Sequence, residues 1–176
     1  MMQTIPSIRA VLSTTAGCWL SLTETLPNDL LTRPPAANEW SALECLQHLH
    51  DAERRVFPMR MQALLNSEDI AAFDPDKEGT KSSLWTPAEL AADFARLRTE
   101  NLAMLEHVGL TDLARSGKHS ELGVVTLGEL LHEWAAHDLM HTVQAERALM
   151  QPFIGNCGPW RLYFQDHDEE VRRRVK

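Results

Sequence analysis

The amino-acid sequence predicts an all-α protein, a four-helix bundle with long crossover loops and a short C-terminal helical segment. Two observations support this fold class. Apolar residues recur every three or four positions along four long segments, which is the period of an amphipathic helix, and turn-forming glycine and proline residues separate those segments. Strand signals are nearly absent. Four such helices joined by long connections are typical of a bundle.

The size and composition favour one domain over residues 1–176. Hydrophobic residues make up 44% and charged residues 24% of the chain, which is typical of a soluble globular protein. No apolar run approaches the roughly 18 residues that a membrane-spanning helix needs. The three cysteines are too few and too scattered for a disulfide framework, so we expect a reducing, cytoplasmic location. The net charge of −8 argues against a nucleic-acid partner, because phosphate binding depends on clusters of Lys and Arg.

The first helix is predicted from about Ile5 to about Glu24. A loop that contains three prolines follows it and separates it from the second helix. The residues expected on its buried face follow three-and-four spacing and are Ile8, Val11, Leu12, Thr15, Cys18, Trp19 and Leu22.

The second helix is predicted to begin after Ser41, whose hydroxyl can cap it while Glu44 completes a capping box. It should extend to about Leu65, with a kink at Pro58 because proline removes a helical hydrogen bond and crowds the preceding turn. Its expected inward face consists of Ala42, Cys45, Leu49, Ala52, Val56, Met59 and Ala63.

An acidic crossover from Asn66 to Leu84 is expected to lead to the third helix. Thr86 is a plausible cap for that helix, and Pro87 suits its first helical position. The helix should continue to about His107. Its expected buried residues are Leu90, Phe94, Leu97, Leu102 and Leu105.

The stretch SGKHSELGVVTLGEL is predicted to be a loop that gives way to the fourth helix. Thr126 can cap this helix with Glu129 at the answering position, and the helix should extend to about Met150. A turn rich in glycine and proline then precedes the short C-terminal segment.

The fourth helix contains the stretch HEWAAHDLMHTVQ, in which His137 and His141 lie four residues apart. At about 100° per residue, these two side chains lie about 40° from each other, so they share one face a single turn apart. That face also carries Leu130, Trp134 and Ala145 and is the one expected to be buried. Two buried imidazoles must each find a polar partner, and either a divalent cation or neighbouring carboxylates and carbonyls would satisfy them.

A third imidazole could come from the second helix, where His48 and His50 lie about 200° apart, so at most one can face the core. His48 lies beside the inward stripe, whereas His50 lies outside it and is expected to meet solvent. Surface or loop positions are expected for the other histidines, His107, His119, His132 and His167.

Three motifs of this chain resemble those of the DinB-like, or DinB/YfiT-like, family of four-helix-bundle metalloenzymes. They are EWSALECLQHLHDAE at the second helix, with Trp40 and Glu53, VTLGELLHEWAAHDLMHTVQ at the fourth, and the Gly-Pro-Trp that follows it. The resemblance covers most of the chain and implies a single DinB-like domain. It also implies that His48, His137 and His141 form a three-histidine site for a divalent metal ion, and that the protein pairs into a homodimer.

Three neutral imidazoles would leave coordination positions for water or substrate, which is the layout of a catalytic metal site. Imidazole suits several divalent metals, of which we favour zinc or nickel. Asp138 and Gln144 are the nearest polar candidates to orient the rings. Asp138, however, lies about 100° from His137 and can equally face a neighbouring helix or solvent.

The resemblance implies a chemistry class for a small-molecule substrate, because characterised family members include transferases that use low-molecular-weight bacterial thiols. The leading hypothesis is therefore metal-dependent thiol transfer or conjugation, with such a thiol as a second cofactor. One alternative is a metal-dependent hydrolase, for which Glu44 and Glu133 are the nearest carboxylates, although each has the pattern of a capping or surface residue. The other is a non-catalytic metal- or ligand-binding stress-response protein, whose site a fourth side chain would close.

Overall fold

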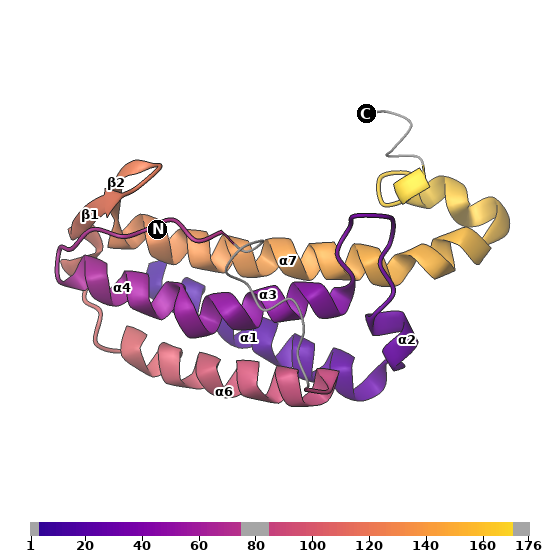
Figure 1. The fold of residues 1–176 in the computed structure, drawn as a ribbon, viewed down its shortest axis with the longest axis horizontal. Helices are drawn as coiled ribbons and strands as arrows, with labels where there is room; N and C mark the ends of the chain where they lie inside the picture. The colour runs from indigo at the N-terminus through magenta and orange to yellow at the C-terminus, as the bar shows by residue number, and fades with distance from the viewer. Residues whose placement is uncertain (1–3, 75–84, 171–176) are drawn as a thin grey trace.

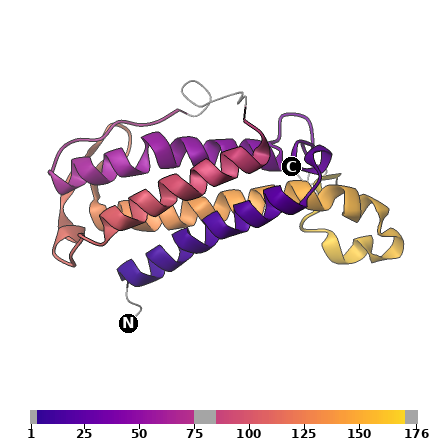
Figure 2. The same cartoon turned by 90° about the horizontal axis from the view of Figure 1, so that it is seen from below.

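The computed structural model describes residues 4–74 and 85–170 and confirms the predicted four-helix bundle (Figure 1). Four long rods lie side by side along one axis, and Figure 2, turned by 90° from Figure 1, shows the same arrangement from below. The rods are α1 (Thr4–Thr25), the broken pair of α3 (Ala42–Arg55) and α4 (Phe57–Leu65), α6 (Pro87–Leu105), and α7 (Leu127–Asn156). The shorter elements are α2 (Asn28–Leu31), η1 (Asp112–Ala114), β1 (Ser116–His119), β2 (Gly123–Thr126) and η2 (Gly158–Phe164).

Local capping chemistry sets where three of the four rods begin. Ser41, Thr86 and Thr126 each accept a hydrogen bond from the backbone three residues later, and the glutamate at that later position binds back to the cap. These reciprocal bonds satisfy amide groups that would otherwise have no helical partner. The predicted helix starts are therefore confirmed.

The kink predicted at Pro58 is also confirmed, because the second rod divides at Val56 into α3 and α4. Proline at the start of α4 occupies a position where no helical N–H is needed. The break changes the phase of the helix. Met59, expected to face inward, is 65% exposed, and Met61 is buried in its place.

The stretch from Ser116 to Thr126 corrects the prediction of a loop, because it forms a small antiparallel hairpin. Gly123 takes a positive φ of 81° at the turn, and Ile70 pairs with His119 beyond the hairpin. Strands of four residues are too short to show a clear alternating pattern. The crossover before α6 includes residues 75–84, which lie outside the described residues.

Two smaller differences occur in the connections and at the C-terminus. The one-turn helix α2 lies within the proline-containing loop, and α7 continues past Met150 to Asn156 with Pro152 inside it. The short C-terminal segment is confirmed as the 3-10 helix η2. None of the described helices is both long enough and apolar enough to cross a lipid bilayer.

The core fills the space between the four rods. Both α1 and α3 pack against α6 and against α7, so α3 and α7 share a long interface. One apolar cluster centres on Trp134 and Phe57, and a second centres on Trp19 and Phe94. The interface between α3 and α7 carries the histidines that the sequence analysis singled out.

Candidate metal centre

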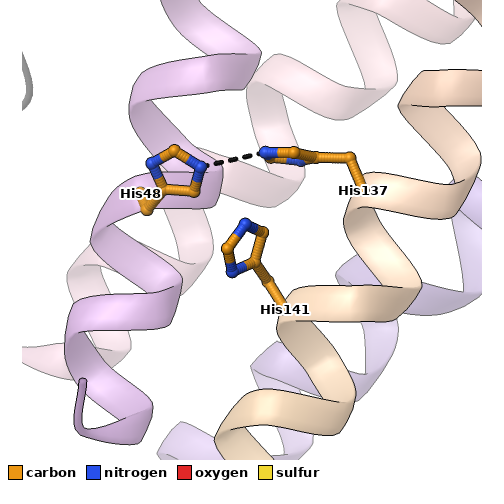
Figure 3. Close-up of side chains that lie close together, drawn as sticks. All are labelled: His48, His137 and His141. Carbon is orange, nitrogen blue, oxygen red and sulfur yellow. Dashed lines mark hydrogen bonds between the residues drawn. The ribbon is translucent and has the colours of Figure 1, made fainter. Parts of the chain in front are cut away.

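The structure brings together His48 from α3 with His137 and His141 from α7 (Figure 3). One nitrogen from each ring lies within 4.8 Å of the others. The Nε2 atoms of His48 and His137 are 2.9 Å apart, and the ring centroids of all three pairs are 4.5–4.9 Å apart. A hydrogen bond from the N–H of one ring to the lone pair of the other accounts for this distance, and a cation held by the rings would take the place of that proton.

Aromatic side chains pack on both ends of this cluster and limit how the imidazoles can turn. Trp40, just before the cap of α3, stacks on His141 with centroids 5.7 Å apart and an interplanar angle of 22°. Phe57, at the start of α4, meets His137 edge-on at 5.2 Å and stacks on Trp134. The break between α3 and α4 thus places an aromatic ring against the face of α7 that carries His137.

Burial keeps all three imidazoles neutral at physiological pH. Loss of solvent, followed by the neighbouring His141, lowers the pKa of His48 to about 4. The same causes, with further contributions from His48, Arg98 and Arg60, lower the pKa of His137 to about 3. Burial also lowers the pKa of His141. A neutral imidazole has a lone pair to offer, so protons do not compete for these nitrogens near pH 7.

Gln144 determines which nitrogen of His141 carries the proton. Nδ1 of His141 lies 2.9 Å from Oε1 of Gln144, and that oxygen can only accept, so Nδ1–H is the donor. The lone pair of His141 is therefore on Nε2. In His137, Nδ1 is buried without a hydrogen-bond partner among the described residues. Of the two orienting residues suggested by the sequence, Gln144 is the one that binds a ring directly.

Among the residues that the structure describes, no fourth histidine, cysteine or carboxylate joins the cluster. A set of three neutral histidines leaves room for exchangeable ligands, as catalytic sites do. Cys45, one turn before His48, is buried outside the cluster. Burial raises the pKa of its thiol to about 12, so it is protonated and inert.

The two carboxylates weighed for hydrolysis differ in their surroundings. Glu44 is engaged in the capping box with Ser41, which confirms its predicted structural role. Glu133 is exposed, as predicted, yet the protein atoms around its carboxyl shield it from solvent and raise its pKa despite the opposing effect of Arg60. Glu133 is the more suitable of the two to accept a proton.

His50 and His119 correct the prediction that they lie at the surface. His50 is buried, and its Nε2 lies 2.8 Å from Oδ2 of Asp93 on α6, so it joins α3 to α6 outside the histidine cluster. His119 is buried in the hairpin, where its Nδ1 accepts hydrogen bonds from two backbone amides. His107 and His132 are exposed, as predicted.

Sequence reasoning did not find the buried polar residues that lie deeper in the bundle. Arg98 and Asn101 on α6 are buried and hydrogen-bond to Glu53 on α3, and Arg98 also binds Asp138 on α7. A signal was present in the third helix: Arg98 lies four residues after Phe94, at a position of the apolar ladder where a polar residue requires a buried partner.

A family model described as the DinB superfamily matches residues 12–145, which is most of the chain. No curated protein matches it. Among solved structures, Bacillus subtilis YfiT, described as a probable metal-dependent hydrolase with an unusual four-helix bundle topology, is 18% identical. That match has a TM-score of 0.72 and covers 84% of this chain and 87% of YfiT. The DinB-like protein YjoA from Bacillus subtilis is 19% identical over 81% of this chain and 90% of its own, with a TM-score of 0.56. At these identities, both likenesses establish the fold.

Proposed function

This chain belongs to the DinB superfamily, and from that membership and its three converging histidines we propose that it is a metal-dependent enzyme. The single observation that carries the proposal is the cluster of His48 and His137, both half-buried, with the buried His141, all three neutral and with no fourth protein ligand among the described residues. These three side chains would hold a divalent ion, of which zinc or nickel suits imidazole ligands.

Bound to these histidines, a divalent ion would act as a Lewis acid that lowers the pKa of a coordinated thiol or water. The chain's own residues would orient the site. Gln144 keeps the proton of His141 on Nδ1, and Trp40 and Phe57 hold the rings from either end. Burial would exclude competing solvent from the ligand nitrogens.

The leading reaction is transfer of a low-molecular-weight thiol to an electrophilic small molecule. A metal-coordinated thiol loses its proton without a separate general base, and no carboxylate of the described residues hydrogen-bonds to the three histidines. The thiolate sulfur would form the new bond to the electrophilic carbon while the leaving group departs with its electron pair. The thiol proton would go to solvent.

Hydrolysis is the second candidate, and Glu133 favours it. This carboxylate lies one helical turn before His137, and its raised pKa makes it a stronger base toward water than an ordinary glutamate. The structural neighbour YfiT is described as a probable metal-dependent hydrolase, which is a statement about that protein.

Elemental analysis of the purified protein tests the metal site. We expect about one equivalent of zinc or nickel in the natural protein and its loss in His48→Ala and in His137→Ala. His132→Ala is the matched control, because His132 lies exposed on the same helix as His137. Undiminished metal in both cluster variants would refute the site.

Activity assays separate the two reactions. The metal-loaded protein is incubated with a panel of low-molecular-weight thiols and 1-chloro-2,4-dinitrobenzene, and separately with p-nitrophenyl esters. We expect thiol conjugation that is lost in His137→Ala and retained in Glu133→Gln. Ester hydrolysis that is abolished by Glu133→Gln would favour the second candidate. Metal binding with neither activity would favour the non-catalytic alternative.

A further inference from the structure

The interior of the bundle holds a second polar cluster, formed by Glu53 on α3, Arg98 on α6 and Asp138 on α7, which we call the buried hub. The side chains of all three are only 1% exposed. Charged groups are rarely buried to this degree unless they are paired. The position of the hub relative to the histidines suggests what it does.

Arg98 joins the two helices that carry the candidate ligands. Its Nε and Nη2 donate to the two oxygens of Glu53 at 2.8 and 2.7 Å, and its Nη1 donates to Oδ2 of Asp138 at 2.7 Å. Glu53 lies five residues after His48, and Asp138 directly follows His137. A planar guanidinium with two bonds on one side and one on the other fixes both distance and angle between α3 and α7.

The charges of the hub do not cancel, since two carboxylates face one guanidinium. The other groups that bind the carboxylates are neutral donors: Asn101 and Trp134 for Glu53, and Thr15 for Asp138. Oδ1 of Asp138 is buried without a hydrogen-bond partner among the described residues. One negative charge is therefore left over in the interior, where solvent screens it weakly.

This excess charge lies close to the histidine cluster. Asp138 acts electrostatically on His141, and Arg98 acts on His137. The two clusters also share packing, because Trp134 donates to Glu53 and stacks on Phe57, which contacts His137. A cation at the three neutral imidazoles would thus have as a near neighbour the carboxylate of Asp138, which directly follows the candidate ligand His137.

We propose that the buried hub is the positioning shell of the metal centre: Arg98 sets the relation of the two ligand helices, and Asp138 supplies the negative charge that a divalent ion balances. This inference rests on the proposed function, because it presupposes an ion at the three histidines. Replacement of a residue that orients or polarises the ligands of a metal site typically lowers the metal affinity 10- to 100-fold.

Asp138→Asn tests the charge with little change of shape. The amide oxygen can still accept from Thr15 and Arg98, so the contacts of the hub persist. Co²⁺ is the probe, because its visible absorption reports both binding and coordination. We expect the Co²⁺ dissociation constant to rise about 10- to 100-fold, while the thermal midpoint of the metal-free protein is unchanged or higher. The control is Glu100→Gln, which removes the same charge from an exposed position on α6.

Arg98→Lys tests the positioning. Lysine keeps the charge and loses the planar fork, so we expect weaker Co²⁺ binding and an altered absorption spectrum. If both hub variants bind Co²⁺ with natural affinity and spectrum, the hub has a structural role only and the inference is overturned. If the natural protein itself binds no Co²⁺, the proposed function fails, and this inference fails with it.

Discussion

Replacement of Arg98 by methionine should strongly destabilise the metal-free protein. The guanidinium donates to both oxygens of Glu53, to Oδ2 of Asp138, to the Leu12 carbonyl and to the Thr15 hydroxyl. It therefore joins α6 to each of the other three rods. Methionine fills similar volume but supplies no donor and no charge, and it leaves two carboxylates buried without a cation.

The expected loss can be estimated from these contacts. Removal of one partner from a buried ion pair costs about 3–5 kcal/mol. Two carboxylates are affected here, but Glu53 keeps its bonds from Asn101 and Trp134, and Asp138 keeps the 2.6 Å bond from Thr15. We therefore expect a fall of about 4 kcal/mol in the free energy of unfolding. For a chain of this size, that corresponds to a thermal midpoint lower by about 8–16 °C.

Urea unfolding at pH 7, followed by circular dichroism without added metal, measures this change. Arg96→Met is the matched control, because Arg96 lies on the same helix and also binds two acids, Asp93 and Glu100, but is solvent-exposed. Exposed ion pairs contribute little, so the control should lose less than about 1 kcal/mol.

If Arg98→Met lowers the free energy of unfolding by less than about 1 kcal/mol, the reasoning is refuted, since the buried cation would then be dispensable. The neutral triple variant Arg98→Met, Glu53→Gln, Asp138→Asn provides a second check. Its hub contains no unpaired charge, so it should recover most of the lost stability. If the triple variant is less stable than Arg98→Met alone, charge burial is not the cause.

Three further predictions concern the imidazoles, the glycines and the tryptophan. The folded protein holds the pKa of His137 at about 3, below the ordinary 6.5, so only the unfolded state takes up a proton as pH falls below 6.5. Through this imidazole, lowering the pH from 8 to 5 should reduce the free energy of unfolding of the metal-free protein by about 2 kcal/mol, as measured by urea unfolding. In His137→Gln the free energy of unfolding should fall less steeply with decreasing pH. Gly117→Ala should be destabilising by about 1–3 kcal/mol, because its Cβ would lie 2.0 Å from the Glu68 carbonyl oxygen. Gly155→Ala, in α7 with open space around it, should raise the free energy of unfolding by about 0.5–1 kcal/mol. Urea unfolding measures both glycine variants, and equal shifts for the two would contradict this prediction. Bound Cu²⁺ or Ni²⁺ should quench tryptophan fluorescence, and Trp40→Phe should remove the largest share of that quenching, since Trp40 contacts two rings of the cluster.

The sequence alone determined the four long helices and where three of them begin. Ser41 and Thr126 are matched by glutamates three residues later, and Pro58 marks the break within the second rod. Such signals act between residues within one or two helical turns, so they can be read without knowledge of the fold. The shared face of His137 and His141 follows from the same helical period. Single-domain organisation, dimerisation and a cytoplasmic location remain predictions.

The burial of His50 and the identity of the buried polar partners depended on tertiary structure. His50 is buried and His48 half-buried, yet only His48 faces α7, because α3 packs against both α6 and α7 and so has two inward faces. The bond from Thr15 to Asp138 spans 123 residues, and that from Arg98 to Asp138 spans 40.

The residue sequence thus encoded the period of the helices, the caps of three of them and the kink of the second, because each of these features depends on neighbours along the chain. Only the folded bundle decided that His50 pairs with Asp93 and that Arg98 lies between Glu53 and Asp138. The physical reason is that a buried polar group takes whichever partner the packing of distant segments brings within hydrogen-bonding reach, and helical periodicity carries no information about that partner.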